Sequence, residues 1–234
     1  MWLHGFTQTQ QSAHEFRSIL AGTYEVLTID LPGHGQNASI EASLLETADL
    51  LARTLPTEPF VLGGYSFGGR VALHFALRHP ERLSRLVLLG ATRGIADAAE
   101  RAQRRERDNN LAAHIEQVGA EAFLDEWLTQ PMFAALPSDP AERAARSRDP
   151  HGLAASLRLA GTGAQAWLGE ALGDVEVPTL ALAGAQDEKF SREAAAIARS
   201  VRRGVSALIP HAQHAAHLEQ PAATAALVAE VQPQ

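Results

Sequence analysis

Cysteine is absent from the 234 residues of this sequence. This absence excludes a disulfide framework, a thiol nucleophile and a thiolate metal site. The sequence also lacks 18 consecutive apolar residues, and its start has no basic segment followed by an apolar run. Neither a membrane-spanning helix nor a secretory leader is therefore expected. We expect a cytoplasmic protein that has no membrane partner.

Basic residues are in the minority. Lys and Arg number 20 against 27 Asp and Glu, for a formal net charge of -7, and Lys189 is the single lysine. A nucleic-acid or anionic-membrane partner requires a basic surface field, so neither class of partner is expected. Hydrophobic residues make up 46% of the chain, which is enough for a substantial core. The length and the lack of internal repeats favour one α/β domain.

Short apolar runs alternate with longer segments of helical periodicity, which is typical of helices covering a parallel sheet. The predicted strands span residues 24–30, 60–65, 86–90, 179–184 and 205–209. The predicted helices span residues 13–20, 44–55, 69–78, 193–201 and 221–231.

Residues 93–173 interrupt this alternation with helical periodicity, recurring proline and no convincing strand. The strand and helix pattern resumes afterwards, so we interpret residues 93–173 as a helical cap inserted into a core of residues 1–92 and 174–234. A separate helical domain is the alternative.

The most informative motif is the segment 64–69, Gly-Tyr-Ser-Phe-Gly-Gly, which lies between a predicted strand and a predicted helix. A serine on such a sharp turn exposes its hydroxyl above the sheet, where the amino end of the helix favours an oxyanion. The motif therefore predicts that Ser66 is a nucleophile or base. A glycine-rich phosphate loop and a plain turn are the alternatives.

A serine hydroxyl needs an imidazole that is oriented by a carboxylate. Asp187 follows a predicted strand and is the candidate acid, with Glu188 as its competitor. His214 follows the next strand and is the candidate base, with His211 and His217 as competitors. The spacing of the three histidines also suggests a metal site, but no accompanying carboxylate motif is present, and no metal is expected.

The segment His4-Gly5-Phe6 follows an apolar Trp2-Leu3 that is interpreted as the end of a strand. A glycine here lets the backbone approach a reacting carbonyl group. The amides of Phe6 and Phe67 are the candidate oxyanion donors. A simple turn is the alternative.

Together, these motifs resemble the α/β-hydrolase superfamily over essentially the whole chain. The resemblance implies an α/β-hydrolase fold with a mostly parallel sheet, flanking helices and an inserted helical cap. Because the chain starts at what resembles the third strand of that fold, the N-terminal strands are expected to be missing and about six parallel strands to remain.

Four segments narrow the resemblance to one family. They are GYSFGGR (64–70), GTGAQ (161–165), AGAQDEKF (183–190) and HAAHLEQP (214–221). They resemble the 2-succinyl-6-hydroxy-2,4-cyclohexadiene-1-carboxylate synthases of menaquinone biosynthesis. Residues 100–108 and 123–133 are also similar to that family. Gln213 and Leu128 depart from residues that are common in the superfamily or the family.

This second resemblance implies a carbon–oxygen lyase without a cofactor. Its substrate is a small-molecule polycarboxylate, a succinyl-enolpyruvyl-hydroxycyclohexene-carboxylate, from which it eliminates pyruvate. The implied substrate-binding residues are Tyr65, Arg70, Arg104, Trp127, Phe133 and Arg146.

Other interpretations of these residues stay open. Arg143 or Arg148 can replace Arg146, and Arg104 lies in a segment whose charge spacing is typical of a solvated helix. Trp127 and Phe133 also suit the interior of the cap. A carboxylic-ester or thioester hydrolase with the same three catalytic residues is the alternative function, and a non-catalytic receptor is a third hypothesis. Oligomeric state is not determined by the sequence.

Overall fold

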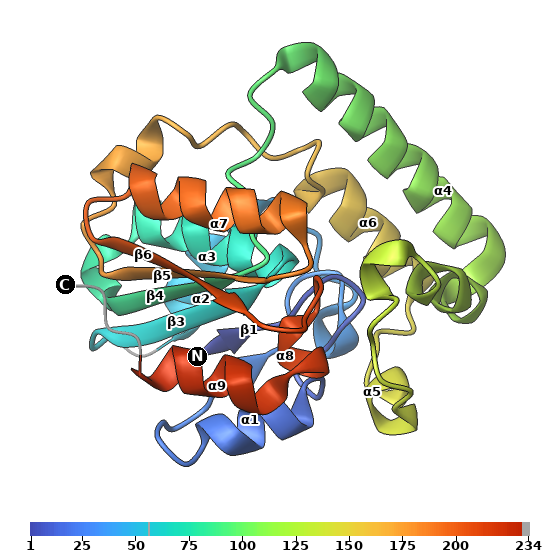
Figure 1. Ribbon diagram of the computed structural model, residues 1–234. Coiled ribbons are helices and arrows are strands. Elements are labelled where there is room, and N and C mark those ends of the chain that lie inside the picture. Colours follow the sequence, from blue (N-terminus) through green and yellow to red (C-terminus); the bar gives the residue numbers. More distant parts are fainter. Residues whose placement is uncertain (56, 231–234) are drawn as a thin grey trace.

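The computed structural model describes residues 1–55 and 57–230 (Figure 1). Its six strands form one parallel sheet in the order β2-β1-β3-β4-β5-β6, so the predicted α/β class is confirmed. The strands are β1 (Trp2–Leu3), β2 (Thr28–Ile29), β3 (Phe60–Tyr65), β4 (Leu83–Leu89), β5 (Thr179–Gly184) and β6 (Gly204–Ile209).

Strand β2 is much shorter than the predicted strand at residues 24–30. It lies at the edge of the sheet and pairs only with β1, through Trp2 with Thr28 and Leu3 with Ile29. An edge strand can extend only as far as its single neighbour supplies backbone groups for hydrogen bonding. Because β1 contributes two residues, the prediction of a longer strand was wrong.

Helices cover both faces of the sheet (Figure 1). One face packs against α2 (Leu44–Thr54), α3 (Phe67–Arg78) and α7 (Glu188–Ser200). The other packs against α1 (His14–Leu20), α8 (Ala216–Glu219) and α9 (Pro221–Glu230). Val231, the last residue of the predicted final helix, lies outside the described residues. Among the described helices, none has both the length and the apolar character that crossing a membrane requires.

The segment between β4 and β5 is helical, as the sequence predicts, and lies beyond the carboxyl ends of the strands (Figure 1). It contains α4 (Ala98–Leu128), α5 (Pro140–Ala144) and α6 (Pro150–Ala160). Gly119, with φ of 83°, breaks the course of α4. Helices α4 and α6 pack together around fully buried Ile115 and Leu153. The segment therefore has an apolar core of its own.

The remaining short helices are 3₁₀ turns: η1 (Gly35–Asn37), η2 (Pro80–Arg82), η3 (Pro131–Phe133) and η4 (Ala171–Asp174).

Candidate active site

Ser66 lies on the sharp turn between β3 and α3. Its backbone has φ of 50° and ψ of -104°, which is a strained conformation for a residue with a side chain. The turn requires glycine on both sides: a Cβ on Gly64 would overlap the Gly68 carbonyl group, and one on Gly68 would overlap the Leu3 carbonyl. The local sequence therefore determines that the Ser66 hydroxyl projects beyond the carboxyl end of the sheet.

The structure brings Ser66, His214 and Asp187 into a hydrogen-bonded chain. The Ser66 hydroxyl oxygen lies 3.1 Å from His214 Nε2. On the other side of the ring, His214 Nδ1 donates to Asp187 Oδ2 at 3.0 Å. The side chain of His214 is almost fully buried and that of Asp187 is 13% exposed. This arrangement can activate the serine hydroxyl as a base or as a nucleophile.

Asp187 is positioned by the helix that follows it. Its Oδ1 accepts the Phe190 amide at 3.1 Å, so the candidate acid is also the N-cap of α7. Burial acts to raise the pKa of Asp187, but the hydrogen bonds from His214 and Phe190 outweigh burial and hold the pKa below its usual value. The competitor Glu188 is exposed and pairs with Arg192, so it faces solvent.

The three competing histidines occupy different surroundings. His214 contacts Ser66, whereas His217 is buried with its ring 4.3 Å from that of Tyr65. Burial lowers the pKa of His217 to about 3, so the ring is neutral at neutral pH. His211 is exposed at a turn. Within the described residues, no group of three His, Asp or Glu side chains is arranged to hold a metal ion.

The two candidate oxyanion donors belong to adjacent loops, since the Gly68 amide donates to the His4 carbonyl at 3.0 Å. Phe6 and Phe67 both line the cavity above Ser66. In the part of the chain that the structure describes, neither the Phe6 nor the Phe67 amide donates to another protein group. Both amides are therefore available to an oxygen that develops negative charge in the cavity.

This cavity has a volume of about 490 Å³ and lies between the carboxyl ends of the strands and helices α4 and α6. Trp127 and Phe133 form part of its wall, with ring centroids 5.8 Å apart. Phe6 contacts Trp127 edge to face at 5.4 Å. Tyr65, beside the serine, also lines the cavity. The wall is thus aromatic close to the candidate catalytic residues.

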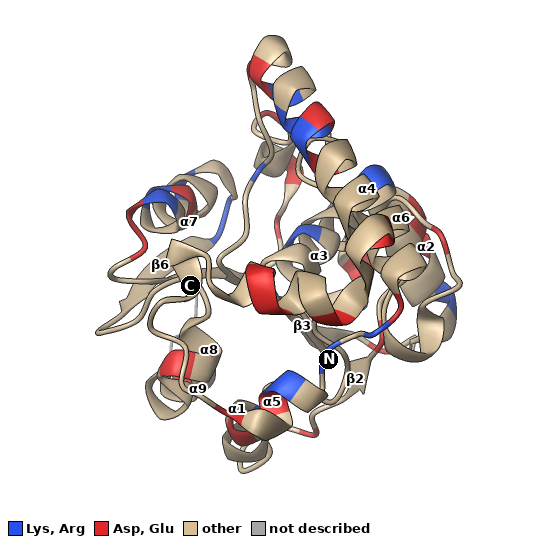
Figure 2. Ribbon diagram, turned by 90° about the vertical axis from the view of Figure 1, so that its right-hand side faces the viewer, with Lys and Arg blue, Asp and Glu red and all other residues tan. Residues whose placement is uncertain are grey.

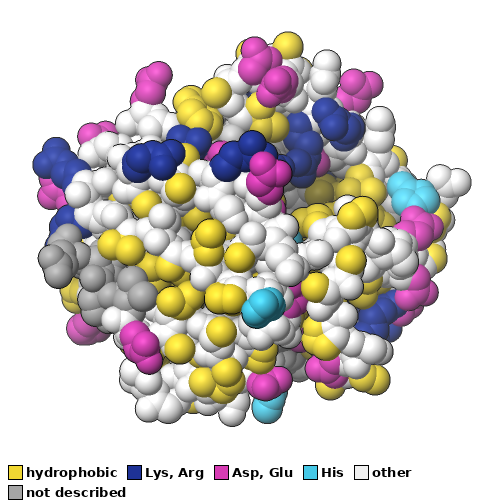
Figure 3. All heavy atoms as spheres, viewed as in Figure 1, with side chains coloured by type: hydrophobic (Ala, Val, Ile, Leu, Met, Phe, Trp, Pro, Cys, Tyr) yellow, Lys and Arg dark blue, Asp and Glu magenta, His cyan; other side chains and the backbone are white. Residues whose placement is uncertain are grey.

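Four cations line the same cavity, which are Arg70, Arg104, Arg107 and Lys189. Figure 3 shows Lys and Arg side chains gathered between α7 and the start of α4, although the net charge of the chain is negative. The carboxylate of Asp108 is the acidic group among the lining residues. The cavity is therefore suited to a ligand with several negative charges.

Arg70 and Arg104 are held in place differently. Arg70 is buried and donates from Nη1 to the Ala160 carbonyl at 2.6 Å. Burial, together with nearby Arg104, lowers the pKa of Arg70 to about 10, so it stays charged at neutral pH. Arg104 donates from Nε to Asp108 at 2.7 Å. The i,i+4 spacing is that of a solvated helix, but Asp108 is buried and also accepts the Gly163 amide at 2.8 Å, so this pair lies at the cavity wall. Figure 2 shows acidic and basic residues interspersed along α4.

Arg146 does not line the cavity above Ser66. It lines a neighbouring cavity of about 930 Å³ between α1 and α5, on the far side of Phe133, which lines both. Its Nη1 donates to the Thr7 hydroxyl at 2.6 Å. Its sequence-based alternatives also point elsewhere, since Arg143 pairs with Asp125 and Arg148 with Glu121.

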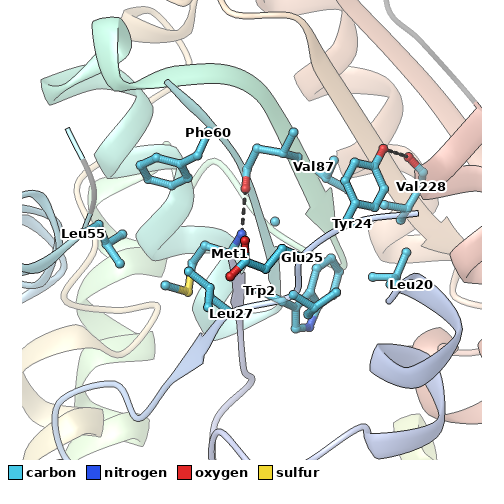
Figure 4. A pocket seen from close by; sticks show the side chains of 13 residues that line it. Met1, Trp2, Leu20, Tyr24, Glu25, Leu27, Leu55, Phe60, Val87 and Val228 are labelled. Atoms are coloured by element: carbon cyan, nitrogen blue, oxygen red, sulfur yellow. Dashed lines mark hydrogen bonds between the residues drawn. The ribbon is translucent and has the colours of Figure 1, made fainter. Parts of the chain in front are cut away.

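A third cavity, of about 260 Å³, lies at the amino ends of the strands (Figure 4). Trp2, Leu27 and Phe60 are among the apolar side chains around it, and the Met1 amine beside them donates to the Val61 carbonyl at 2.9 Å. Ligands of open α/β sheets bind at the carboxyl ends of the strands. This apolar cavity contains none of the candidate catalytic residues.

Sequence reasoning missed Lys189 and Arg107 as cavity residues. Lys189 is exposed over much of its side chain, but partial desolvation of its ammonium group and neighbouring Arg104 lower its pKa, and its Nζ lies 5.0 Å from the centre of the Phe190 ring. The signal for Lys189 was its position two residues after the candidate acid, which places it at the same edge of the sheet. No comparable signal distinguished Arg107 from the other arginines of α4.

Residues 1–227 match the alpha/beta hydrolase family. A protein of Bacillus subtilis, described as a putative 2-succinyl-6-hydroxy-2,4-cyclohexadiene-1-carboxylate synthase, is 34% identical over 97% of this chain and 88% of its own length. The synthase of that name from Enterobacter sp. is 34% identical over 99% of this chain and 90% of its own.

Two solved structures are similar in fold and sequence. MenH from S. aureus superposes with a TM-score of 0.90 at 32% identity, covering 97% of this chain and 90% of that one. A thermophilic esterase from Thermogutta terrifontis, solved with malate bound, has a TM-score of 0.81 at 25% identity, covering 98% of this chain and 87% of that one.

Proposed function

Because the chain belongs to the alpha/beta hydrolase family, and within it to the family of the 2-succinyl-6-hydroxy-2,4-cyclohexadiene-1-carboxylate synthases, we propose that it is a carbon–oxygen lyase of menaquinone biosynthesis. It eliminates pyruvate from a succinyl-enolpyruvyl-hydroxycyclohexene-carboxylate. The observation that carries the proposal is that Arg70 and Arg104 line the same cavity as Ser66 and His214. A neutral ester needs no such cations, whereas a polycarboxylate does.

The reaction begins with proton abstraction. His214 accepts the hydroxyl proton of Ser66, and the serine oxygen removes the proton α to the succinyl carbonyl group. Asp187 holds the ring with Nδ1 protonated and stabilises the imidazolium. The electron pair of the broken C–H bond moves onto the carbonyl oxygen, which accepts hydrogen bonds from the Phe6 and Phe67 amides.

Elimination completes the reaction. The electron pair returns to form the new ring double bond while the C–O bond to the enolpyruvyl group breaks. The leaving oxygen takes up the proton, and the enol converts to pyruvate. Proton transfer by a positioned base and stabilisation of the oxyanion each contribute roughly 10²–10³-fold to such a rate. No step calls for a metal or a redox cofactor.

The substrate carboxylates bind to Arg70 and Arg104 in this proposal, with Lys189 as a further cation. Tyr65, Trp127 and Phe133 contact the carbon skeleton. The expectation that Arg146 binds a carboxylate loses its support, because Arg146 lies in the neighbouring cavity and bonds to Thr7.

Residues 93–173 act as the cap over this site, and residues 1–92 and 174–234 form the catalytic core. The proposed partner is the small-molecule polycarboxylate, and the proposed location is the cytoplasm. Limited proteolysis tests the cap: with substrate bound, cleavage within residues 93–173 is expected to slow, while unchanged cleavage argues against closure over a ligand.

The direct test is pyruvate release from the enolpyruvyl precursor by the purified protein, followed with a coupled dehydrogenase. Ser66→Ala is the matched control, because it removes one oxygen and leaves the cavity intact. Pyruvate formation that is abolished in this variant supports the lyase. If the unsubstituted protein releases no more pyruvate than Ser66→Ala, the proposal fails.

A serine esterase is the second candidate, because the triad geometry serves acyl transfer equally well and an esterase is among the similar structures. An esterase hydrolyses short p-nitrophenyl esters with a burst from the acyl-enzyme. The lyase is expected to turn over such esters only feebly. Efficient ester turnover without pyruvate release would favour the second candidate.

A further inference from the structure

Thr7 immediately follows Phe6, whose amide is a proposed oxyanion donor. Its backbone has φ of 68°, in the left-handed region that β-branched residues rarely adopt, and its side chain is fully buried. Such a conformation persists only where the surrounding structure holds it. The orientation of the peptide groups around Phe6 therefore depends on what holds Thr7.

Every polar group of Thr7 has a partner. Its amide donates to His34 Nε2 at 3.3 Å, and its carbonyl oxygen accepts the Ser147 amide at 2.8 Å. Its hydroxyl oxygen accepts a hydrogen bond from Arg146 Nη1 at 2.6 Å. His34 belongs to the loop after β2, whereas Arg146 and Ser147 belong to the helical segment between β4 and β5.

The two residues from the helical segment are part of a longer contact. Residues 142–147 run along residues 7–13 and are joined to them by hydrogen bonds. Thr9 donates to the Ala145 carbonyl, and the Ala13 amide donates to the Glu142 carboxylate at 2.7 Å. Arg146 itself is buried and lies 3.9 Å from the Glu142 carboxylate, so its charge is paired within this contact.

His34 approaches Thr7 from the opposite side. Its Nδ1 donates to the Pro32 carbonyl at 2.9 Å, which leaves the Nε2 lone pair as the acceptor for the Thr7 amide. Its ring stacks on Phe67, with centroids 5.4 Å apart, and lies edge-on to Phe6 at 5.7 Å. His34 thus contacts both residues whose amides form the proposed oxyanion hole.

We propose that Arg146 and His34 are positioning residues that hold Thr7, and through it the Phe6 amide, in the geometry that binds the oxyanion. The inference rests on the proposed function of the Phe6 amide and replaces the expected role of Arg146 in substrate binding. It links the helical segment to the chemistry, because Arg146 belongs to that segment and Thr7 to the core.

The test compares Thr7→Val, which removes the hydroxyl and keeps the branched shape, with Thr7→Ser, which keeps the hydroxyl. Thr7→Val and Arg146→Gln are each expected to lower kcat for pyruvate release by about 10-fold or more, below the 10²–10³-fold cost of losing a donor outright. KM is expected to stay within about twofold, since substrate binding is unaffected. Thr7→Ser is expected to retain activity near that of the unsubstituted protein.

The two substitutions remove the same interaction, so the double variant Thr7→Val/Arg146→Gln is expected to be no slower than the slower single variant. His34→Phe keeps a ring on Phe67 but removes the acceptor, and is expected to lower kcat in the same way. If Arg146→Gln instead raises KM at unchanged kcat, and Thr7→Val has no effect, Arg146 binds substrate and the inference is overturned.

Thr9→Val is the matched control, because it breaks a neighbouring bond between the same two segments without touching Thr7. Its activity is expected to remain unchanged. A loss as large as that of Thr7→Val would assign the effect to general docking of the segments and overturn the inference. Thermal unfolding of each variant shows whether the fold is retained.

A second measurement is independent of the lyase reaction. Ser66 is expected to react with a p-nitrophenyl phosphonate, whose tetrahedral adduct places an oxygen in the oxyanion hole. Thr7→Val and Arg146→Gln are expected to slow this labelling by about 10-fold, and Thr9→Val is not. Slowed labelling in a protein that releases no pyruvate would leave the inference standing while the proposed function fails. Unchanged labelling in both variants would overturn the inference.

Discussion

The Nδ1 atom of His214 lies 3.0 Å from Asp187 Oδ2, and the other oxygen of the same carboxylate accepts the first-turn amide of α7. One carboxylate thus orients the candidate base and caps a helix. These two hydrogen bonds orient the Asp187 carboxylate without any further side chain, because the Phe190 amide holds one oxygen and His214 binds the other. A substitution that keeps the capping oxygen but removes the charge can therefore separate the catalytic role proposed for Asp187 from its role as a helix cap.

Asp187→Asn is expected to lower kcat by roughly 10³–10⁴-fold with little loss of stability. The amide oxygen of asparagine can still cap α7, but the neutral side chain neither stabilises an imidazolium nor enforces the required tautomer of His214. Pyruvate-release kinetics and thermal unfolding measure the two effects. Glu188→Gln, at the exposed neighbouring position, is the control and is expected to behave as the unsubstituted protein. A modest loss of activity in Asp187→Asn would argue against a triad.

Arg104→Gln is expected to raise KM for the polycarboxylate by roughly 10- to 100-fold, while kcat changes by less than about threefold. One charge-assisted hydrogen bond to a carboxylate contributes about 1.5–3 kcal/mol. The substitution weakens binding of the substrate and of the transition state equally, so KM rises while kcat hardly changes. Arg105→Gln, next to it on α4 but exposed and outside the cavity, is the control. Equal KM values in the two variants would remove Arg104 from the binding site.

Gly68→Ala is expected to destabilise the protein by about 2 kcal/mol or more, because the added Cβ overlaps the Leu3 and His4 carbonyl groups. In a chain of this length such a loss lowers Tm by about 4–8 °C. Gly173→Ala is the control, since a Cβ there meets no atom within 4 Å. Calorimetry compares the two variants. An unchanged Tm in Gly68→Ala would show that β1 can move away from the turn at Ser66.

Buried neutral histidines are expected to weaken the fold in acid. Burial lowers the pKa of His4 to about 4 and those of His34 and His217 to about 3, against about 6.5 in an unfolded chain. Between these values the unfolded state binds more protons, so the free energy of unfolding falls as the pH is lowered from about 6.5 towards 3. Each such histidine adds up to about 1.4 kcal/mol per pH unit to the slope.

His217→Phe tests this pH dependence, because it keeps a ring against Tyr65 and removes the titrating group. Urea unfolding from pH 7 to pH 4 is expected to show a shallower acid slope in this variant, by about 1.4 kcal/mol per pH unit at most. His151→Gln, which removes an exposed histidine, is the control and is expected to leave the slope unchanged. If the free energy of unfolding falls equally steeply with decreasing pH in both variants, His217 has the same pKa in the folded and unfolded states.

Much of the fold follows from patterns that are local in the sequence. The predicted strands at 60–65 and 179–184 coincide with β3 and β5, because continuous apolar runs bounded by turns identify strands that are covered on both faces. Helix α7 begins at Glu188 and not at the predicted residue 193, because Asp187 caps it. The turn at Ser66 is likewise local, since glycines within a few residues decide whether it can form.

The sequence by itself thus determined the parallel sheet, the turn that exposes Ser66, and the chain order in which an acid and a histidine follow the serine. These features depend on steric limits and hydrophobic periodicity over a few residues. Only the tertiary structure decided that His214 and not His217 faces Ser66, that Lys189 and Arg107 join Arg70 in the cavity, and that Arg146 turns to Thr7. The physical reason is that a long side chain reaches whichever partner the packing of distant segments brings within hydrogen-bonding range, and residue spacing does not encode that packing.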